Sequence, residues 1–274
     1  MLHLIPLRTF KKAITFQDTE RSYFVHFPSG YDNNKKYPLV VMLHGYSDSP
    51  RLMELYSGMS RKADKEKFIV VYPKGLSDTH DRHLSWSAGF CCGAAARAHS
   101  DDVAFIDQLL DEVSTQYAVD TKKVYIAGFS NGAMFAHLLG THLHAKVAAI
   151  AAIAGCIGSD TAYLQNKGFP VPILIMNGRA DRTIPFTGGG GYASVTETVN
   201  FWKSNNKSTQ EYVSKEKFYD KTIYSDSEGR NEVAFYEIYD GKHLWFGRKR
   251  ESVALLLNKP IFTTEEVWDF FKKH

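Results

Sequence analysis

The sequence has little of what marks disulfide-stapled, membrane-spanning or nucleic-acid-binding proteins. Only three of its 274 residues are cysteine, too few for a scaffold held by several disulfides. Its longest run of apolar residues and glycine, Val147–Gly158, is shorter than the roughly 18 residues that a membrane-spanning helix needs. The formal net charge is only +3, with both signs interspersed, so the charge indicates no nucleic-acid partner. We therefore expect a globular protein with no membrane span.

A secretory signal is also lacking. The segment Met1–Leu7 is mildly apolar, but Pro6 and Arg8 interrupt it and no small-residue cleavage site follows. The sequence therefore predicts either an intracellular protein or one whose leader has been removed.

The cysteines are Cys91, Cys92 and Cys156, an odd number that allows at most one internal disulfide. A bridge between sequence neighbours is strained, so Cys156 is the better partner for either of the other two. The alternative is three buried thiols in a reducing compartment. The sequence leaves both possibilities open.

What the sequence does contain is an alternation of short apolar runs with amphipathic segments. Strands are expected at Leu39–Leu43, Phe68–Tyr72, Val124–Ala127, Val147–Ala154, Ile173–Met176 and Val233–Tyr239, after an opening hairpin of Ala13–Phe16 and Tyr23–Phe27. Helices are expected at Leu52–Glu66, Asp101–Tyr117, Ser130–His142, Val195–Ser204 and Glu265–Lys273. This order predicts a mostly parallel sheet covered on both faces, with the hairpin as antiparallel edge strands. We expect one domain over residues 1–274, with the polar stretch Asn205–Arg230 as a surface insertion.

The strongest chemical signal is Gly128-Phe129-Ser130-Asn131-Gly132, which matches the pattern G-x-S-x-G. It lies between a predicted strand and a predicted helix, where the turn of an α/β-hydrolase presents its nucleophile. Ser130 is therefore the candidate nucleophile. The alternative is a chance match in a glycine-rich turn.

A serine hydroxyl needs a base, and this fold orders its residues as serine, acid, histidine. Only His243 and the terminal His274 follow His144, and His243 comes just after a predicted strand. Asp181 is the candidate acid because it follows the buried strand Ile173–Met176, and open α/β sheets place their sites at such strand ends. The other aspartates between Ser130 and His243 fit less well: Asp160, Asp220, Asp226 and Asp240.

Two backbone N–H groups must hold the negative oxygen of the tetrahedral intermediate. One is expected from Asn131 and the other from Tyr46, in the loop after Leu39–Leu43. His44 in the same loop is interpreted as a structural histidine that bonds local backbone. This chemistry needs no cofactor.

Metal-like histidine spacings occur in His80-x-x-His83 and His142-x-His144. Neither has further ligands at convincing positions, so no metal site is expected.

Together these residues resemble the secreted esterases grouped with polyhydroxybutyrate depolymerases and feruloyl or acetylxylan esterases. The matching pieces run through most of the chain: Tyr37–Val41, Leu43–Gly45, Val71–Pro73, Trp86, Cys91–Gly93, Asp101–Val103, Gly128–Gly132, Ala180–Asp181, Pro185–Phe186 and His243 with Trp245 and Gly247. The resemblance implies an α/β-hydrolase fold and a triad of Ser130, Asp181 and His243, and it favours secretion.

The sequence therefore predicts a serine esterase that forms an acyl-enzyme. Aromatic residues in the site loops are candidates for substrate binding, with core packing as the alternative: Trp86, Phe129, Phe186 and Trp245. They favour a short or planar acyl group, with hydroxybutyrate oligomers preferred slightly over feruloyl or acetylxylan esters. Acyl transfer or peptide cleavage by the same residues, and a catalytically inactive binding protein, are the competing interpretations. The sequence does not indicate an oligomeric state.

Overall fold

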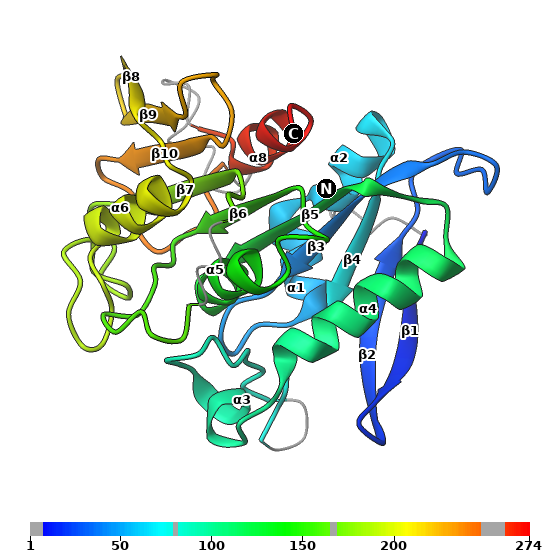
Figure 1. Ribbon diagram of the computed structural model, residues 1–274. Coiled ribbons are helices and arrows are strands. Elements are labelled where there is room, and N and C mark those ends of the chain that lie inside the picture. The colour runs from blue at the N-terminus through cyan, green and yellow to red at the C-terminus, as the bar shows by residue number, and fades with distance from the viewer. Residues whose placement is uncertain (1–7, 79–81, 165–168, 248–260) are drawn as a thin grey trace.

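One ten-stranded sheet runs through the part of the chain that the computed structural model describes, residues 8–78, 82–164, 169–247 and 261–274 (Figure 1). Its strands are β1 (Thr9–Phe16), β2 (Thr19–His26), β3 (Tyr37–Leu43), β4 (Ile69–Pro73), β5 (Val119–Phe129), β6 (Ala149–Ile153), β7 (Ile173–Gly178), β8 (Gln210–Lys215), β9 (Tyr219–Ser225) and β10 (Val233–Ile238). Their spatial order is β1-β2-β4-β3-β5-β6-β7-β10-β9-β8. The six central strands from β4 to β10 are parallel, and an antiparallel hairpin closes each edge.

The central strands are apolar throughout because the sheet is buried on both faces. In β3, Leu39, Val41 and Leu43 point into one half of the core, whereas Val40 and Met42 point into the other. All five side chains are fully buried. An unbroken apolar run thus marks a strand that serves two hydrophobic layers.

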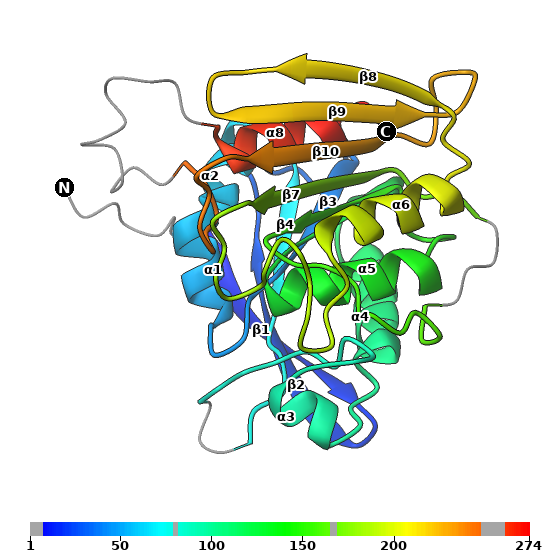
Figure 2. The same ribbon diagram turned by 90° about the vertical axis from the view of Figure 1, so that its left-hand side faces the viewer.

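Helices cover both faces of this sheet (Figures 1 and 2). They are α1 (Pro50–Ser57), α2 (Met59–Glu66), α3 (Gly93–Arg97), α4 (Asp102–Gln116), α5 (Asn131–His142), α6 (Val195–Asn205) and α8 (Thr263–Phe271). Helices α4, α5 and α6 contribute to one core layer, and α1, α2 and α8 contribute to the other. This arrangement confirms the predicted α/β-hydrolase architecture with its N-terminal antiparallel hairpin.

The structure differs from the prediction at a helix boundary and at a turn. The helix expected over residues 52–66 is divided into α1 and α2, because Gly58 has a φ of 65° and ends α1 in the left-handed conformation. The hairpin turn lies at Gln17 and Asp18, both with positive φ, rather than near residues 20–22. No helix among the described residues is long and apolar enough to cross a membrane, and the segment Met1–Leu7 lies outside the described residues.

The polar stretch Asn205–Arg230 forms the hairpin β8–β9, which extends the sheet along the upper edge in Figure 2. Strand β8 is exposed on both faces, including Tyr212 at 67% and Val213 at 44% exposure. A strand that buries neither face has no need of apolar alternation, so its sequence resembles a loop. The prediction of a surface insertion missed β8 for that reason, and β9, which is half-buried with only Thr222 buried, was missed with it.

Candidate active site

The predicted nucleophile occupies the sharp turn between β5 and α5. Ser130 has a φ of 54° and a ψ of −120°, a backbone conformation that costs an L-residue about 1–3 kcal/mol. The turn is tight because a Cβ atom on Gly128 would lie 2.0 Å from the Gly132 carbonyl oxygen. Likewise, a Cβ on Gly132 would lie 2.4 Å from the carbonyl oxygen of Leu43 in β3. Both glycines of the motif are therefore required by close backbone approach.

His243 lies within hydrogen-bonding distance of this serine. Its Nε2 atom is 2.9 Å from Ser130 Oγ, and its Nδ1 atom is 2.7 Å from Asp181 Oδ2. Ser130 follows β5, Asp181 follows β7 and His243 follows β10. Because these strands are parallel, their carboxyl ends meet at one edge of the sheet and bring the three side chains together. With Nδ1–H donating to Asp181, Nε2 is free to accept the Ser130 hydroxyl proton.

The carboxylate of Asp181 is held from its other side. Its Oδ1 atom accepts hydrogen bonds from the N–H groups of Thr183 at 2.8 Å and Ile184 at 2.9 Å. Its side chain is only 1% exposed, whereas that of His243 is 18% exposed. The array is thus buried at the acid and open towards solvent at the base, as a site that must admit a substrate requires.

The loops that carry the acid and the base pack directly on each other. A Cβ on Gly178, at the end of β7, would lie 2.0 Å from the carbonyl oxygen of Gly241. The N–H of Ala180 donates to that same Gly241 carbonyl at 3.0 Å. These backbone contacts fix the distance between Asp181 and His243.

The segments that carry the two predicted oxyanion donors lie beside Ser130. Asn131 is the first residue of α5, so its N–H has no partner within the helix. The loop after β3 approaches from the other side, since a Cβ on Gly45 would lie 3.4 Å from Ser130 Cβ. Neither the Asn131 N–H nor the Tyr46 N–H donates a backbone hydrogen bond within the described residues.

His44 is a structural residue, as predicted. Its Nδ1 atom bonds the carbonyl oxygen of Gly45 at 2.8 Å, and its Nε2 atom accepts the N–H of Gly75 at 3.0 Å. Complete burial lowers the pKa of His44 to about 4. The ring is therefore neutral at pH 7 and anchors the loop that carries Tyr46.

The four aromatic residues predicted to bind substrate divide into two pairs. Phe129 and Phe186 are partly exposed, and the Phe129 ring lies 5.1 Å from the His243 ring. Trp86 and Trp245 are 0% and 2% exposed, so the prediction that they line the site is wrong and core packing holds. Each buried indole N–H has an internal acceptor, which for Trp245 is Thr264 Oγ1 at 3.0 Å. A tryptophan whose indole N–H has an acceptor inside the protein can be buried without leaving a polar group unpaired.

The cysteine prediction requires a similar correction. Cys91 is bonded to Cys92, and Cys156 is a buried free thiol. Neither possibility left open by the sequence, a bridge to Cys156 or three free thiols, is the one formed. Burial raises the pKa of Cys156 to about 12, so this thiol remains protonated at neutral pH.

Within the described ranges, no group of three or more His, Cys, Asp or Glu side chains could hold a metal ion. Of the histidine pairs noted in the sequence, His80 lies outside the described residues. His83 Nδ1 is hydrogen-bonded to Ser47 Oγ at 2.7 Å, and the ring of His144 stacks on that of Phe169.

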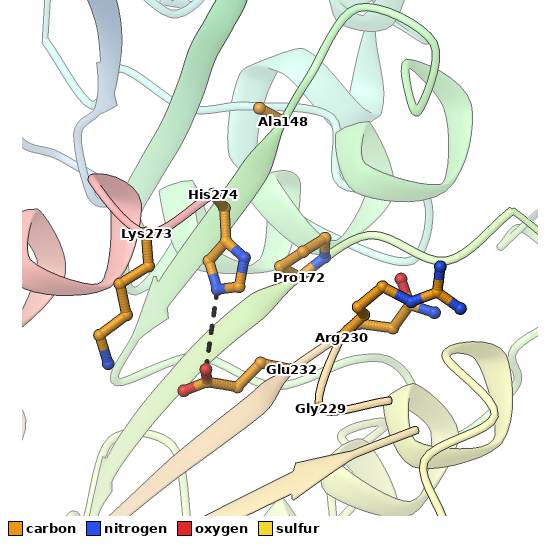
Figure 3. Close-up of a pocket in the computed structure, with 8 residues that line it drawn as sticks. Ala148, Pro172, Gly229, Arg230, Glu232, Lys273 and His274 are labelled. Carbon is orange, nitrogen blue, oxygen red and sulfur yellow. Dashed lines mark ion pairs between the residues drawn. The ribbon is translucent and has the colours of Figure 1, made fainter. Parts of the chain in front are cut away.

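A separate pocket of about 460 Å³ lies at the opposite edge of the sheet, beside residues that directly precede β6, β7 and β10 (Figure 3). His274 Nε2 lies 3.8 Å from Glu232 Oε2 there. Burial lowers the pKa of His274 to about 4. The terminal histidine is therefore packed on the opposite side of the sheet from Ser130, and His243 is the histidine at the candidate site.

The chain is similar to known esterases in sequence. A family model described as Esterase PHB depolymerase matches residues 21–164. The chain is 30% identical over 171 residues to a bifunctional acetylxylan esterase/xylanase from Neocallimastix patriciarum, covering 62% of this chain and 23% of that protein. It is 28% identical over 188 residues to feruloyl esterase B from Piromyces equi, covering 68% of this chain and 34% of that protein. The chain thus spans about a quarter to a third of the length of these two relatives.

The fold is similar to that of a solved acetyl xylan esterase from Aspergillus awamori, with a TM-score of 0.67 and 16% identity over 85% of this chain and 94% of that one. This likeness concerns the fold alone. The family model covers more than half of the sequence, including the serine turn, and the chain therefore belongs to the Esterase PHB depolymerase family.

Proposed function

We propose that the protein is a serine carboxylic ester hydrolase that works through an acyl-enzyme on Ser130. The observation that carries this proposal is the continuous array from Ser130 Oγ to His243 at 2.9 Å and from His243 to Asp181 at 2.7 Å. Such an array removes the serine proton as the nucleophile attacks. An inactive binding protein would have no need of it.

In this mechanism, Ser130 Oγ attacks the acyl carbon while His243 Nε2 takes the hydroxyl proton. Asp181 holds the imidazole and stabilises its charged form. The backbone N–H groups of Asn131 and Tyr46 hold the negative oxygen of the tetrahedral intermediate. The imidazolium then gives its proton to the leaving alcohol oxygen, and water releases the acid by the same steps. The reaction requires no cofactor.

We propose acetyl or hydroxycinnamoyl esters of plant polysaccharides as the substrate class. The names of the two relatives support this choice, and the partly exposed Phe129 ring beside His243 offers a flat apolar surface to a short or planar acyl group. The family description supports hydroxybutyrate oligomers as the second candidate. We also propose that residues 1–274 form one domain, because both core layers pack on the same sheet.

A panel of soluble esters tests these proposals. We expect p-nitrophenyl acetate or butyrate to be cleaved much faster than the palmitate ester, with no activation at an oil–water interface. Methyl ferulate, an acetylated xylo-oligosaccharide and a hydroxybutyrate dimer, with products identified by mass, distinguish the substrate classes and reveal any acyl transfer. Absence of both hydrolysis and fluorophosphonate labelling would refute the esterase proposal.

A further inference from the structure

Trp86 joins the two segments that carry the proposed oxyanion donors. The residue is fully buried, so it does not contact a substrate. Its backbone and its indole ring form hydrogen bonds in opposite directions, one set towards α5 and the other towards the loop after β3. Trp86 therefore connects Asn131 to the loop that carries Tyr46.

The first connection runs to the serine turn. Asn131 Oδ1 accepts the N–H of Trp86 at 2.8 Å, and Asn131 Nδ2 donates to the carbonyl oxygen of Trp86 at 3.0 Å. This pair of bonds holds the side chain of Asn131, which is only 1% exposed, in a single orientation. It therefore also fixes the backbone N–H that the same residue presents beside Ser130.

The second connection runs to the other donor segment. The indole N–H of Trp86 donates to the carbonyl oxygen of His44 at 3.1 Å. The ring lies 5.0 Å from the His44 ring and stacks at 5.3 Å on Phe135 of α5. His44 is only two residues before Tyr46, and its own ring bonds the Gly45 carbonyl oxygen.

We propose that Trp86 is a positioning residue that sets the separation between the Asn131 and Tyr46 N–H groups. The proposal rests on the esterase function and on the oxyanion donors proposed above. Donors to a developing oxyanion act only when they are held at the place where the negative charge forms. Loosening either end of the connection should therefore weaken binding of the transition state more than binding of the substrate.

The test is Trp86→Phe, which keeps an aromatic ring but removes the hydrogen bond to His44. Deleting an oxyanion donor outright costs roughly 10²–10³-fold in kcat, so a displaced donor should cost at least about tenfold. KM for p-nitrophenyl acetate should stay within about twofold of the wild type, because the ground-state ester makes little use of the donors.

Trp202→Phe is the matched control. Trp202 is also fully buried, and its indole N–H donates to His137 Nδ1 at 2.8 Å, six residues after Asn131 in α5 and without contact to either donor residue. The two variants lose equivalent hydrogen bonds, so both should have a lower melting temperature. Only Trp86→Phe should lower kcat.

A boronic acid inhibitor supplies the second readout, because its tetrahedral serine adduct places an oxygen in the oxyanion site. Its inhibition constant should rise in Trp86→Phe by the same factor by which kcat falls. Asn131→Ala opens the other end of the connection while keeping the backbone N–H, and it should show the same paired change even where Trp86→Phe does not fold.

Equal kcat values for Trp86→Phe and Trp202→Phe, or an unchanged kcat in folded Asn131→Ala, would overturn the positioning role while leaving the esterase proposal intact. An inactive wild-type protein that no fluorophosphonate labels would overturn both.

Discussion

Replacing Asp181 by asparagine tests how the structure selects the tautomer of His243. Two backbone N–H groups, from Thr183 at 2.8 Å and Ile184 at 2.9 Å, point at Oδ1 of Asp181. In Asp181→Asn the amide oxygen must take this position, because an NH₂ group there would face two donors. The NH₂ group then faces Nδ1 of His243 at the place of the present 2.7 Å bond. Nδ1 must accept, the ring proton moves to Nε2, and Nε2 can no longer take the proton of Ser130.

The expected loss follows from this exchange of donor and acceptor. A histidine held in the wrong tautomer lowers kcat by about 10⁴-fold, or about 5 kcal/mol at 1.36 kcal/mol per tenfold. The assay is steady-state hydrolysis of p-nitrophenyl acetate at pH 7. Circular dichroism and thermal unfolding of the same samples establish that Asp181→Asn is folded.

Asp226→Asn provides a matched control. Oδ1 of Asp226 also accepts two backbone N–H groups, from Glu228 at 3.0 Å and Arg230 at 2.7 Å, but in the loop between β9 and β10. We expect kcat within about twofold of the wild type for this control, because its side chain does not contact the triad. A folded Asp181→Asn protein that retains more than a tenth of the wild-type kcat would refute the reasoning.

Three further predictions follow from the described contacts. Ser130→Ala should fold normally and lose at least ~10³-fold in kcat, because the covalent step disappears; near wild-type activity would exclude Ser130 as the nucleophile. Burial lowers the pKa of His44 to about 4 and that of His137 to about 3. The unfolded chain therefore binds more protons than the folded one below about pH 6.5, and stability is lost as the pH falls from there towards 4, by about 2 kcal/mol per histidine at pH 5. Urea unfolding at pH 7.5 and pH 5 measures this loss, and equal free energies of unfolding at the two pH values would contradict it. Alkylation of the denatured, non-reduced protein should modify Cys156 alone, whereas three modified thiols would exclude the bridge between Cys91 and Cys92.

The parallel sheet and the grouping of Ser130, Asp181 and His243 could be predicted because both depend on local patterns. Apolar runs such as Leu39–Leu43 mark strands buried on two faces. Parallel strands place their carboxyl ends at one edge, so residues that follow three such strands must come together. The close contact of Gly178 with Gly241, which sets the distance between acid and base, depends on how two loops pack and leaves no such pattern.

Other features could not be predicted because they depend on which way a side chain turns. Trp86 lies in a loop and Phe129 is the last residue of β5, yet the first is buried and the second is partly exposed. What separates them is the acceptor that Trp86 finds at the His44 carbonyl, a contact between residues 42 positions apart. The bond between Cys91 and Cys92 likewise joins two of three cysteines whose pairing the sequence left open.

The outer strand β8 bears on how the protein behaves in concentrated solution. Among the described residues β8 is the last strand of the sheet, so one row of its backbone N–H and C=O groups has no neighbouring strand there, and Tyr212 and Val213 are exposed at its centre. Such an edge invites addition of a foreign strand and hence aggregation. Glu211 and Lys215 lie on either side of this pair, and charges at an edge disfavour stacking of further strands. Replacing these two charges by threonine should lower the concentration at which the protein begins to aggregate, with no effect on hydrolysis, because neither residue belongs to the triad.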